Sequence, residues 1–281
     1  MRIDLHTHSS ASDGTQSPAE LIAEAKAERL GMVALTDHDT TAGWEEAVGA
    51  ALHHGIRLVR GIEISCSRNH RSIHLLGYLP NPDDPRLVIE LARARDSRVT
   101  RMDRMIERMA ADGIPVSVEE VRAQVAPGAT LGRPHLADAL VAAGVVPSRD
   151  EAFRDLLHDR SRYYVGHYAP DPVAAIRLVR SAGGVPVLAH PFAMRGATVS
   201  DELVAELAAA GLAGIEAHHR DHEPADVERA IRLAQRHDLV VTGSSDYHGT
   251  GKLNRLGERT TEPREWSRIV EQSSGVKVVE P

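Results

Sequence analysis

Cysteine and aromatic residues are scarce in this chain. It has 281 residues but a single cysteine, Cys66, which excludes an internal disulfide framework. Aromatic residues make up 3% of the sequence, so the core must be built from valine, leucine, isoleucine and alanine. A single cysteine suits a reducing compartment. With no base partner in the sequence around it, Cys66 is interpreted as a small core residue and not as a nucleophile.

Long apolar runs and targeting segments are also missing. No apolar stretch reaches the roughly 18 residues that a membrane span needs, and the N-terminus begins directly with a strand pattern instead of a signal peptide. We therefore expect a cytoplasmic protein without a membrane partner. The formal net charge of −7 argues against a broad nucleic-acid-binding surface and a stable nucleic-acid partner, although a local basic pocket remains compatible with it.

Histidine is abundant, with 16 residues, and its placement near the N-terminus points to metal binding. The stretch Asp4-Leu-His-Thr-His8 puts two histidines at alternate positions of a short strand, where side chains share a face. Asp13 follows beside Gly14, which allows the chain to turn back toward the same point. Imidazole nitrogens and a carboxylate gathered in this way are typical of a metal site.

Strands alternate with helices through most of the chain. The pattern predicts strands at residues 2–6, 32–36, 58–65, 72–79, 185–189, 214–217 and 239–243. Seven strands are close to a closed β/α barrel, in which active sites lie at the C-terminal ends of the strands. The predicted fold class is therefore α/β, a seven-stranded TIM-like barrel.

Only helical patterns occur between about residues 95 and 165. A long helix is predicted at about 84–111, followed by short ones at about 117–125, 133–143 and 148–158. The arginines of the long helix are interpreted as a solvated, salt-bridged surface: Arg93, Arg95, Arg98, Arg101, Arg104 and Arg108. We therefore predict a catalytic barrel over 1–94 and 166–281, with a small all-helical insertion domain over 95–165.

Residues able to bind metal are expected at the ends of most barrel strands. They are His6, His8, Asp13, His38, Glu63, His74, His190, Asp246 and His248. One ion accepts about four to six ligands, so a set of this size predicts two or three divalent ions that share bridging carboxylates. Any one of these histidines alone could be structural, but chance does not explain the joint placement. The remaining histidines outside the motifs are expected on solvated surfaces or helix ends: His53, His54, His70, His158 and His237.

Five segments resemble the motifs of the polymerase and histidinol phosphatase (PHP) superfamily. They are Asp4–His8, Thr36–Asp39, Gly61–Ser65, Ala189–Pro191 and Gly243–His248. The resemblance covers residues 1 to about 255 and implies a distorted seven-stranded β/α barrel with a trinuclear metal centre. The implied ligand sets are His6, His8, Glu63 and Asp246 for one ion, Asp13, His38 and His248 for a second, and Glu63, His74 and His190 for a third.

Many members of that superfamily have histidine where this chain has Asp13. An anionic oxygen is a harder ligand than an imidazole nitrogen, so Asp13 favours manganese (Mn²⁺) or iron (Fe²⁺) over zinc (Zn²⁺). Of these, manganese is the expected cofactor.

The helical insertion resembles one branch of the superfamily. Gly132-Arg-Pro-His135, with Ala152-Phe153 and Tyr163–Val165, is similar to a subgroup of stand-alone PHP phosphatases with a helical lid. That subgroup includes enzymes acting on nucleoside 3′,5′-bisphosphates and on short 5′-phosphorylated oligonucleotides. The resemblance implies that Arg133 and His135 reach the substrate phosphate, and an arginine fork matches a phosphate well. The alternative is that Arg133 is an ordinary residue at a helix start.

His219 and His222 fall where the same subgroup has phosphate-contacting residues, and the alternative for both is an ordinary surface position. The expected reaction is hydrolysis of a phosphomonoester by in-line attack of a metal-bridging hydroxide, with the metals neutralising charge on the phosphoryl oxygens. The expected catalytic residues are Glu63, Asp246, Arg133 and His222, although a metal-bound water is an alternative to His222 as proton donor. A 5′–3′ exonuclease activity is a further expectation.

Other functions remain open on the sequence alone. Histidinol phosphate is an alternative substrate. Barrel amidohydrolases also gather His and Asp at strand ends and cleave C–N bonds, commonly with a carboxylated lysine. Here no lysine lies at a strand exit, and the nearest late one is Lys252. A non-catalytic metal-binding module is the third alternative, but a structural site usually closes with four ligands.

Overall fold

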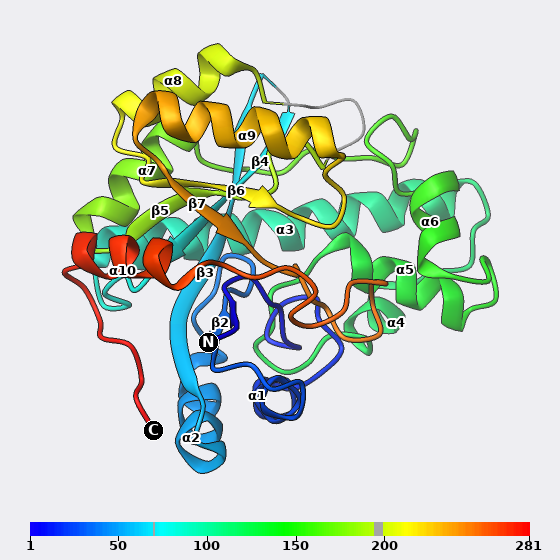
Figure 1. The fold of residues 1–281 in the computed structure, drawn as a ribbon. Coiled ribbons are helices and arrows are strands. Elements are labelled where there is room, and N and C mark those ends of the chain that lie inside the picture. The colour runs from blue at the N-terminus through cyan, green and yellow to red at the C-terminus, as the bar shows by residue number, and fades with distance from the viewer. Residues whose placement is uncertain (70, 194–198) are drawn as a thin grey trace.

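The predicted strands form a single sheet in chain order. The computed structural model describes residues 1–69, 71–193 and 199–281, so His70 lies outside the described part (Figure 1). The strands are β1 (Ile3–Asp4), β2 (Met32–Leu35), β3 (Arg57–Arg68), β4 (Arg71–Tyr78), β5 (Val185–Leu188), β6 (Gly214–His218) and β7 (Val240–Gly243).

Helices connect most of the strands. In the described residues they are α1 (Pro18–Ala27), α2 (Trp44–His54), α3 (Pro85–Ala111), α4 (Val118–Arg122), α5 (Arg133–Ala142), α6 (Arg149–Asp155), α7 (Pro172–Ser181), α8 (Asp201–Ala209), α9 (Pro224–His237) and α10 (Pro263–Gln272). The sequence analysis did not anticipate α10. Among the described helices, none combines the length and the apolar character needed to cross a membrane.

The sheet curves into a nearly closed barrel, which confirms the predicted fold class. Strands β1, β2 and β3 pair in parallel with one another, and so do β5, β6 and β7. Beyond the ends of β1 and β7, Thr7 and Tyr247 form a parallel bridge, and the His8 N–H donates to the Tyr247 carbonyl at 2.8 Å. This bridge joins the first and last strands at the rim where the parallel strands end.

Strand β4 departs from the barrel pattern because it runs antiparallel to both β3 and β5. It follows β3 as a hairpin, in which Ser65 pairs with His74 and Glu63 pairs with Leu76. His74 therefore reaches the rim from the N-terminal half of a reversed strand, so its expected position at a strand exit is wrong. Glu63 likewise lies inside β3, which continues past it to Arg68.

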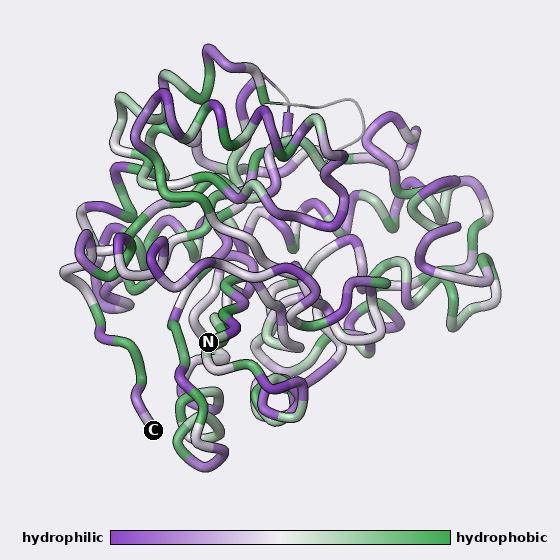
Figure 2. The backbone as a smooth tube through the Cα atoms, in the orientation of Figure 1, coloured by the Kyte–Doolittle hydropathy of each residue, from purple (hydrophilic) through white to green (hydrophobic). Residues whose placement is uncertain are grey.

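Alternate side chains of the short strands divide between two hydrophobic clusters, as the pleat requires. Met32 and Ala34 belong to one cluster, which includes Trp266 of α10, whereas Val33 and Leu35 belong to the cluster shared with α1 and α2. Figure 2 shows hydrophobic segments in the region of the sheet and, alternating with hydrophilic ones, in the parts of the chain around it. Cys66 is buried in the second of these clusters, as expected for a small core residue.

The helical insertion has a small core of its own. A third cluster contains only residues between Met102 and Val165, drawn from α3, α4, α5 and α6 and the segments that follow them. Figure 1 shows α4, α5 and α6 grouped at one end of α3. Because α3 runs unbroken from Pro85 to Ala111, the expected boundary at residues 94 and 95 falls inside this helix. The division into two domains stays a prediction.

The expectation of a solvated arginine surface on α3 is wrong for two residues. Arg98 and Arg101 are only 9% and 5% exposed. The guanidinium of Arg98 donates to Asp39 Oδ2 at 3.0 and 2.8 Å and to Ser65 Oγ at 2.6 Å. Since Asp39 follows His38 directly, α3 packs on the loop that carries a predicted metal ligand.

Candidate metal centre

Glu63 is the carboxylate around which the predicted metal-binding side chains meet. It is fully buried. Its Oε2 lies 3.1 Å from His6 Nε2, 3.0 Å from His8 Nε2 and 3.2 Å from His38 Nδ1, and its Oε1 lies 2.7 Å from His74 Nδ1 and 3.1 Å from His190 Nε2. Both oxygens thus face several imidazoles, the arrangement needed for a carboxylate that bridges two ions.

The first predicted ligand set is gathered in the structure. Donor atoms of His6, His8, Glu63 and Asp246 all lie within 4.8 Å of one another. Asp246 Oδ1 is 3.5 Å from His6 Nε2 and 3.4 Å from His8 Nε2. Two histidines and two carboxylates therefore surround one position.

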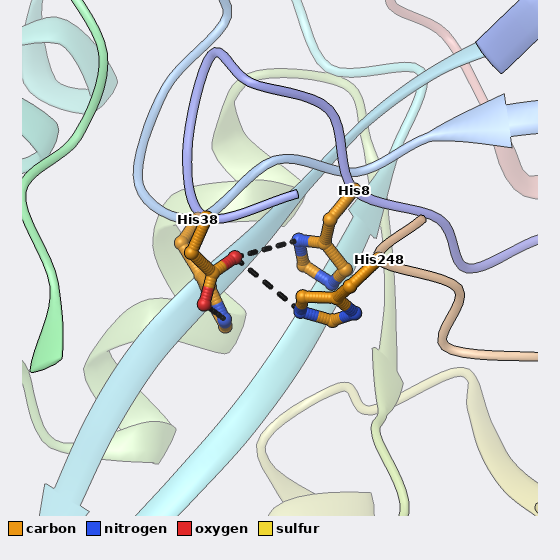
Figure 3. Close-up of side chains that lie close together, drawn as sticks. His8, His38 and His248 are labelled. Atoms are coloured by element: carbon orange, nitrogen blue, oxygen red, sulfur yellow. Dashed lines mark ion pairs between the residues drawn. The ribbon is translucent and has the colours of Figure 1, made fainter. Parts of the chain in front are cut away.

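The second set is also gathered, with His8 as an additional member. Donor atoms of His8, Asp13, His38 and His248 lie within 4.8 Å of one another. Figure 3 shows the imidazoles of His8, His38 and His248 around one carboxylate. Asp13 Oδ1 is 3.3 Å from His248 Nε2, and Oδ2 is 3.8 Å from His38 Nε2. His8 thus belongs to both groups.

The third set is divided in the structure. His74 groups with His38 and Glu63, whereas His190 groups with His6 and Glu216. Both His74 and His190 still approach the same oxygen of Glu63. The division brings in Glu216, which the sequence analysis had not considered.

Buried polar atoms without partners test whether this cluster fits metal ions. Glu63 Oε2, His38 Nδ1, His74 Nδ1 and His248 Nε2 are buried and make no hydrogen bond among the described residues. Several of them lie about 3 Å from a donor or acceptor but without hydrogen-bond geometry. Buried polar atoms without partners are costly. A cation bound among these atoms would give them a partner, and it would also explain why they lie so close together without hydrogen-bond geometry. The residues fit a group of divalent ions with nitrogen and oxygen ligands.

Local structure explains how Asp13 reaches the cluster. Asp37 accepts hydrogen bonds from the Ser9 N–H at 2.8 Å, from Ser9 Oγ at 2.7 Å and from Ser12 Oγ at 2.7 Å. These bonds fix the loop after β1 against the end of β2. A Cβ on Gly14 would lie 2.3 Å from the carbonyl oxygen of His8, so only glycine fits this close turn.

Three residues of the rim adopt a left-handed backbone that is uncommon outside glycine. Their φ angles are +54° for Asp39, +24° for His190 and +52° for Asp246. Backbone strain of this kind gathers at functional sites, where the surrounding structure holds it in place. At His190 and Asp246 this conformation turns the chain sharply just after β5 and β7, where these two predicted ligands lie.

Glu216 supports two of the predicted ligands. It is fully buried in β6, with Oε1 3.3 Å from His6 Nδ1 and Oε2 accepting from the His190 N–H at 2.8 Å. A carboxylate on the second ring nitrogen orients a metal-binding histidine and fixes its tautomer. Burial alone would raise the pKa of Glu216, but His6 and other nearby histidines lower it to about 2. The available sequence signal was a glutamate inside an otherwise apolar strand.

The carboxylates of the cluster hold their negative charge. Burial alone would raise the pKa of Asp13, but His248 and His38 keep it well below its usual range. Burial alone would also raise the pKa of Glu63, but the nearby histidines, above all His38 and His6, keep it well below its usual range. Ionised carboxylates and neutral imidazoles are the forms that bind metal.

A cleft of about 200 Å³ opens above the cluster. It is lined by His38, Glu63, His74, His190, Ala193, His219, Asp221, Asp246 and Lys252. Lys252 Nζ lies 2.7 Å from Asp246 Oδ2. Although 42% of the Lys252 side chain is exposed, its ammonium group is partly desolvated, which would lower its pKa; Asp246 and Asp13 outweigh this and raise the pKa, so the lysine is a cation at the site. The sequence analysis mentioned this lysine only as too distant from a strand exit.

The two predicted lid residues are held within the helical insertion. Arg133 Nη1 donates to the Leu157 carbonyl at 2.7 Å and pairs with Asp159 Oδ1 at 2.6 Å. His135 is 4% exposed, and its Nδ1 accepts from the Gly132 N–H at 3.0 Å, which caps the start of α5. Burial lowers the pKa of His135, and the nearby charge of Asp13 acts in the opposite direction, so His135 lies in the neighbourhood of Asp13.

His219 and His222 differ in what their ring nitrogens do. His222 donates from Nδ1 to the Ala217 carbonyl at 2.8 Å and accepts at Nε2 from the Phe192 N–H at 3.3 Å. Both of its nitrogens are therefore used by the backbone. His219 Nε2 is buried without a hydrogen-bond partner in the described part of the chain and lies 3.6 Å from Asp246 Oδ2. Of the two, His219 faces the cleft.

Comparisons with known proteins agree with this fold and cluster. Residues 4–98 match the PHP domain. A curated 3′,5′-nucleoside bisphosphate phosphatase from Chromobacterium violaceum is 34% identical, over 90% of this chain and 89% of its own length. A phosphoribosyl 1,2-cyclic phosphate 1,2-diphosphodiesterase from Eggerthella lenta is also 34% identical, over 91% and 98%. A 5′-3′ exoribonuclease from Haemophilus influenzae is 33% identical, over 88% and 90%.

Solved structures extend the similarity to the whole fold. A structure from Bifidobacterium adolescentis, described as a metal-dependent phosphoesterase, has a TM-score of 0.93 and 41% identity, covering 98% of this chain and 96% of its own. A structure from Chromobacterium violaceum, described as an amidohydrolase with bound sulfate, has a TM-score of 0.87 and 30% identity, covering 98% of both chains.

A β/α barrel with a shared cluster of histidines and carboxylates defines a class of metal-dependent hydrolases. This chain belongs to the PHP family, as its motifs predicted. Within that family it is a metal-dependent phosphoesterase, and the predicted enzyme class is confirmed at that level.

Proposed function

We propose that this enzyme removes a phosphate from a nucleotide, namely a nucleoside 3′,5′-bisphosphate or a short 5′-phosphorylated oligonucleotide. The observation that carries the proposal is the cleft in which Lys252, a cation, adjoins the Glu63-centred cluster. A phosphate monoester carries two negative charges near neutral pH. Lys252 offers it positive charge on one side, and metal ions bound by the cluster would offer it on the other.

The proposed metal ligands are the nine predicted residues, His6, His8, Asp13, His38, Glu63, His74, His190, Asp246 and His248. Two or three divalent ions, with manganese as the proposed metal, would be held by them. Bound ions of this kind polarise phosphoryl oxygens and lower the pKa of a water molecule. Glu63 and Asp246 are the carboxylates proposed to be shared, because each approaches two or more histidines.

The residues of the chain are proposed to orient the phosphate and move the proton. Lys252 would neutralise a non-bridging oxygen from the side of Asp246. Arg133 and His135 would close on the phosphate from the insertion, and Arg133 would have to exchange its contact with Asp159 for the substrate. Such a fork-shaped donor matches phosphate in two bonds.

For protonation of the leaving group we favour His219 over His222. Among the described residues, His219 Nε2 makes no hydrogen bond and lines the cleft, whereas both nitrogens of His222 bond to backbone groups. His222 would then serve to hold the loop after β6 against Phe192. A proton donor must lie within hydrogen-bond reach of the leaving oxygen, and His219 lines the cleft where that oxygen would be.

A nucleotide is favoured because a larger groove continues from the cleft. The groove has a volume of about 910 Å³ and shares Asp221 and Lys252 with the cleft. Phe153 lines it from α6, and Leu253, which is 77% exposed, lines it from the barrel. Apolar side chains on both walls suit a base and a ribose. Two similar proteins are named for nucleotide or RNA substrates.

Hydrolysis of a C–N bond is less well supported, although a similar structure is described as an amidohydrolase. A carboxylated lysine forms from a neutral amine. The Lys252 Nζ is paired with Asp246 at 2.7 Å, and Asp246 and Asp13 raise its pKa against the effect of desolvation. This lysine is therefore held in the charged form that does not react.

A phosphate-release screen tests the proposal. Manganese-loaded protein would be offered adenosine 3′,5′-bisphosphate, a 5′-phosphorylated RNA oligomer, histidinol phosphate and a phosphoribosyl 1,2-cyclic phosphate. We expect release from the first two, with loss of activity in Glu63→Gln protein. Activity confined to histidinol phosphate or to the cyclic phosphate would overturn the proposed substrate. Undiminished release by Glu63→Gln protein, after chelation and manganese addition, would overturn the proposed site.

A further inference from the structure

The helical insertion contacts the barrel loop that presents Asp13. The N–H of Thr130 donates to the carbonyl of Ala11 at 2.9 Å, and Ala11 lies between His8 and Asp13 in the chain. Thr130 is only 2% exposed, so this bond is shielded from water. The insertion thus holds the backbone just before a proposed metal ligand.

Arg149, at the start of α6, makes a second contact with the barrel. Its Nε and Nη2 donate to the two carboxylate oxygens of Asp138 in α5, and such a two-bond pair fixes the plane of the guanidinium. A Cβ added to Gly251 would collide with the remaining nitrogen, Nη1, so the backbone of Gly251 lies directly against it. Glycine permits this close approach. Arg149 therefore joins the insertion to the loop after β7, which carries His248.

The loop with His38 is held from α3, the helix that leads into the insertion. Arg95 Nη1 donates to the Asp39 carbonyl at 2.8 Å, and Arg98 bonds to the carboxylate of the same residue. Asp39 follows His38 directly in the chain. Contacts from α3 and the insertion therefore reach the three loops that carry Asp13, His38 and His248.

These three loops supply ligands to one position. Donor atoms within 4.8 Å of one another surround what we call the second metal position: His8, Asp13, His38 and His248. Two of the loops are also bonded to each other. The Thr250 N–H donates to Thr15 Oγ1 at 2.9 Å, and the Thr15 N–H donates to the His248 carbonyl at 3.1 Å. A displacement of the loop after β7 is therefore passed on to the loop with Asp13.

Arg149 is a cation close to the second metal position. It lines the groove of about 910 Å³ together with Asp13 and His248. Burial would lower the pKa of Arg149, but Asp138 and, to a smaller extent, Asp13 raise it. Its ion-pair partner is Asp138. The pair thus keeps the guanidinium beside the second metal position without occupying the Asp13 carboxylate.

We propose that Arg149 is a positioning residue that couples the helical insertion to the second metal position. The inference rests on the proposed metal ligands. Arg149 acts through the backbone of Gly251, and so on the loop that presents His248. Coupling of this kind is reciprocal. Displacing Arg149 weakens the ion at the second metal position, and the ion in turn favours the insertion docked on the barrel.

A manganese titration tests the coupling without turnover. The electron paramagnetic resonance signal of free Mn²⁺ would give the number of bound ions and their affinities in the parent protein, in Arg149→Met and in a control. The matched control is Arg162→Met, because Arg162 pairs with Asp112 within the insertion and is 72% exposed. We expect Arg149→Met to bind one of the ions about 10-fold more weakly, the lower end of the loss when a supporting residue is removed. The other ions, and the control, should be unchanged.

Gly251→Ala separates the contact with the barrel from the pair within the insertion. The added methyl group must displace Arg149 Nη1, whereas Asp138 is left untouched. We expect the same ion to be weakened as in Arg149→Met. Weakening in Arg149→Met without weakening in Gly251→Ala would show that Arg149 only holds α5 and α6 together, and it would overturn the coupling.

The remaining outcomes distinguish the coupling from the proposed site. Unchanged Mn²⁺ binding in Arg149→Met, or equal weakening of every ion, would overturn the coupling alone. Unchanged binding with a raised KM for adenosine 3′,5′-bisphosphate would make Arg149 a substrate contact and would also overturn it. A parent protein that binds no Mn²⁺ would instead overturn the proposed metal ligands, and the coupling with them.

Hydrogen exchange tests the reciprocal effect of the ion on the insertion. Mn²⁺ should slow the exchange of backbone amides in α5 and α6 of the parent and of Arg162→Met, by about the same 10-fold factor. The effect should be much smaller in Arg149→Met. An equal effect of Mn²⁺ in the parent and in Arg149→Met, or no effect in the parent, would contradict the coupling.

Discussion

The carboxylate of Asp39 accepts two hydrogen bonds from the guanidinium of Arg98, at 3.0 and 2.8 Å. Its other oxygen accepts from the Ser65 N–H at 2.9 Å. Asp39 is fully buried and follows His38 in a left-handed backbone turn. One buried ion pair thus connects three parts of the molecule: the insertion helix α3, the loop with His38, and the strand with Glu63.

Replacing Arg98 with methionine should destabilise the protein strongly. The change leaves the Asp39 carboxylate buried without its cation, and removing one partner of a buried pair costs about 3–5 kcal/mol. Urea unfolding would measure this loss, with Arg104→Met as the control at an exposed site of α3. A change as small as that of the control would contradict the role given to this pair.

Replacing Glu216 with glutamine should weaken metal binding, although Glu216 is not one of the nine predicted metal ligands. Glutamine keeps the size of the side chain but loses the negative charge facing His6 Nδ1. Loss of such a supporting carboxylate typically lowers metal affinity about 10- to 100-fold. Competition with a coloured chelator would measure the affinity for manganese. Unchanged affinity would mean that Glu216 does not orient His6.

Replacing Asp13 with histidine should change which metal supports activity. Asp13 supplies the anionic oxygen beside His248, His38 and His8. An imidazole there would make the ligand set entirely nitrogen, which favours zinc over manganese. Phosphate release by chelated protein, after addition of each metal in turn, would show the change. The same order of metals in both proteins would contradict a selective role for Asp13.

The half-buried ring of His167 should make stability fall in mild acid. Its pKa is lowered to about 3 in the folded protein by burial and by Arg98, Arg101 and Arg133, whereas a histidine in the unfolded chain titrates near 6.5. Between these values the unfolded state binds more protons, so the free energy of unfolding decreases as the pH falls below about 6.5. From pH 7 to pH 5 this group should contribute a loss of about 1–2 kcal/mol.

Other groups also titrate in this range, so the measurement is a difference between two proteins. Urea unfolding of the parent and of His167→Gln at both pH values isolates the histidine. We expect a smaller loss in His167→Gln. Equal losses in both proteins would contradict a His167 that is neutral in the folded protein.

Much of the barrel follows from local patterns in the sequence. Short apolar runs such as Met32–Leu35 and Val185–Leu188 end directly before polar motifs, and seven such strands were anticipated. The His6 and His8 pair follows from the alternation of side chains along a strand. The structure also brings Asp13 close to both His38 and His248, although their separation in the chain hides this proximity.

Other features depend on contacts that local patterns do not contain. The burial of Arg98 is determined by Asp39, which lies far away in sequence, whereas the helical pattern alone favoured a solvated arginine. Glu216 was overlooked because its neighbours in β6 read as an ordinary apolar strand. The antiparallel direction of β4 could have been predicted from the sequence. Parallel neighbouring strands need a crossover connection, usually a helix, and no helix lies between β3 and β4.

The central claim is that the Glu63-centred cluster binds metal ions on which phosphate release depends. The most direct measurement follows phosphate release from adenosine 3′,5′-bisphosphate and metal content together, in parent and Glu63→Gln protein. We predict that chelation abolishes release by the parent, that manganese restores it, and that Glu63→Gln neither retains the metal nor regains activity. Full release by protein stripped of metal, or by Glu63→Gln, would contradict the claim.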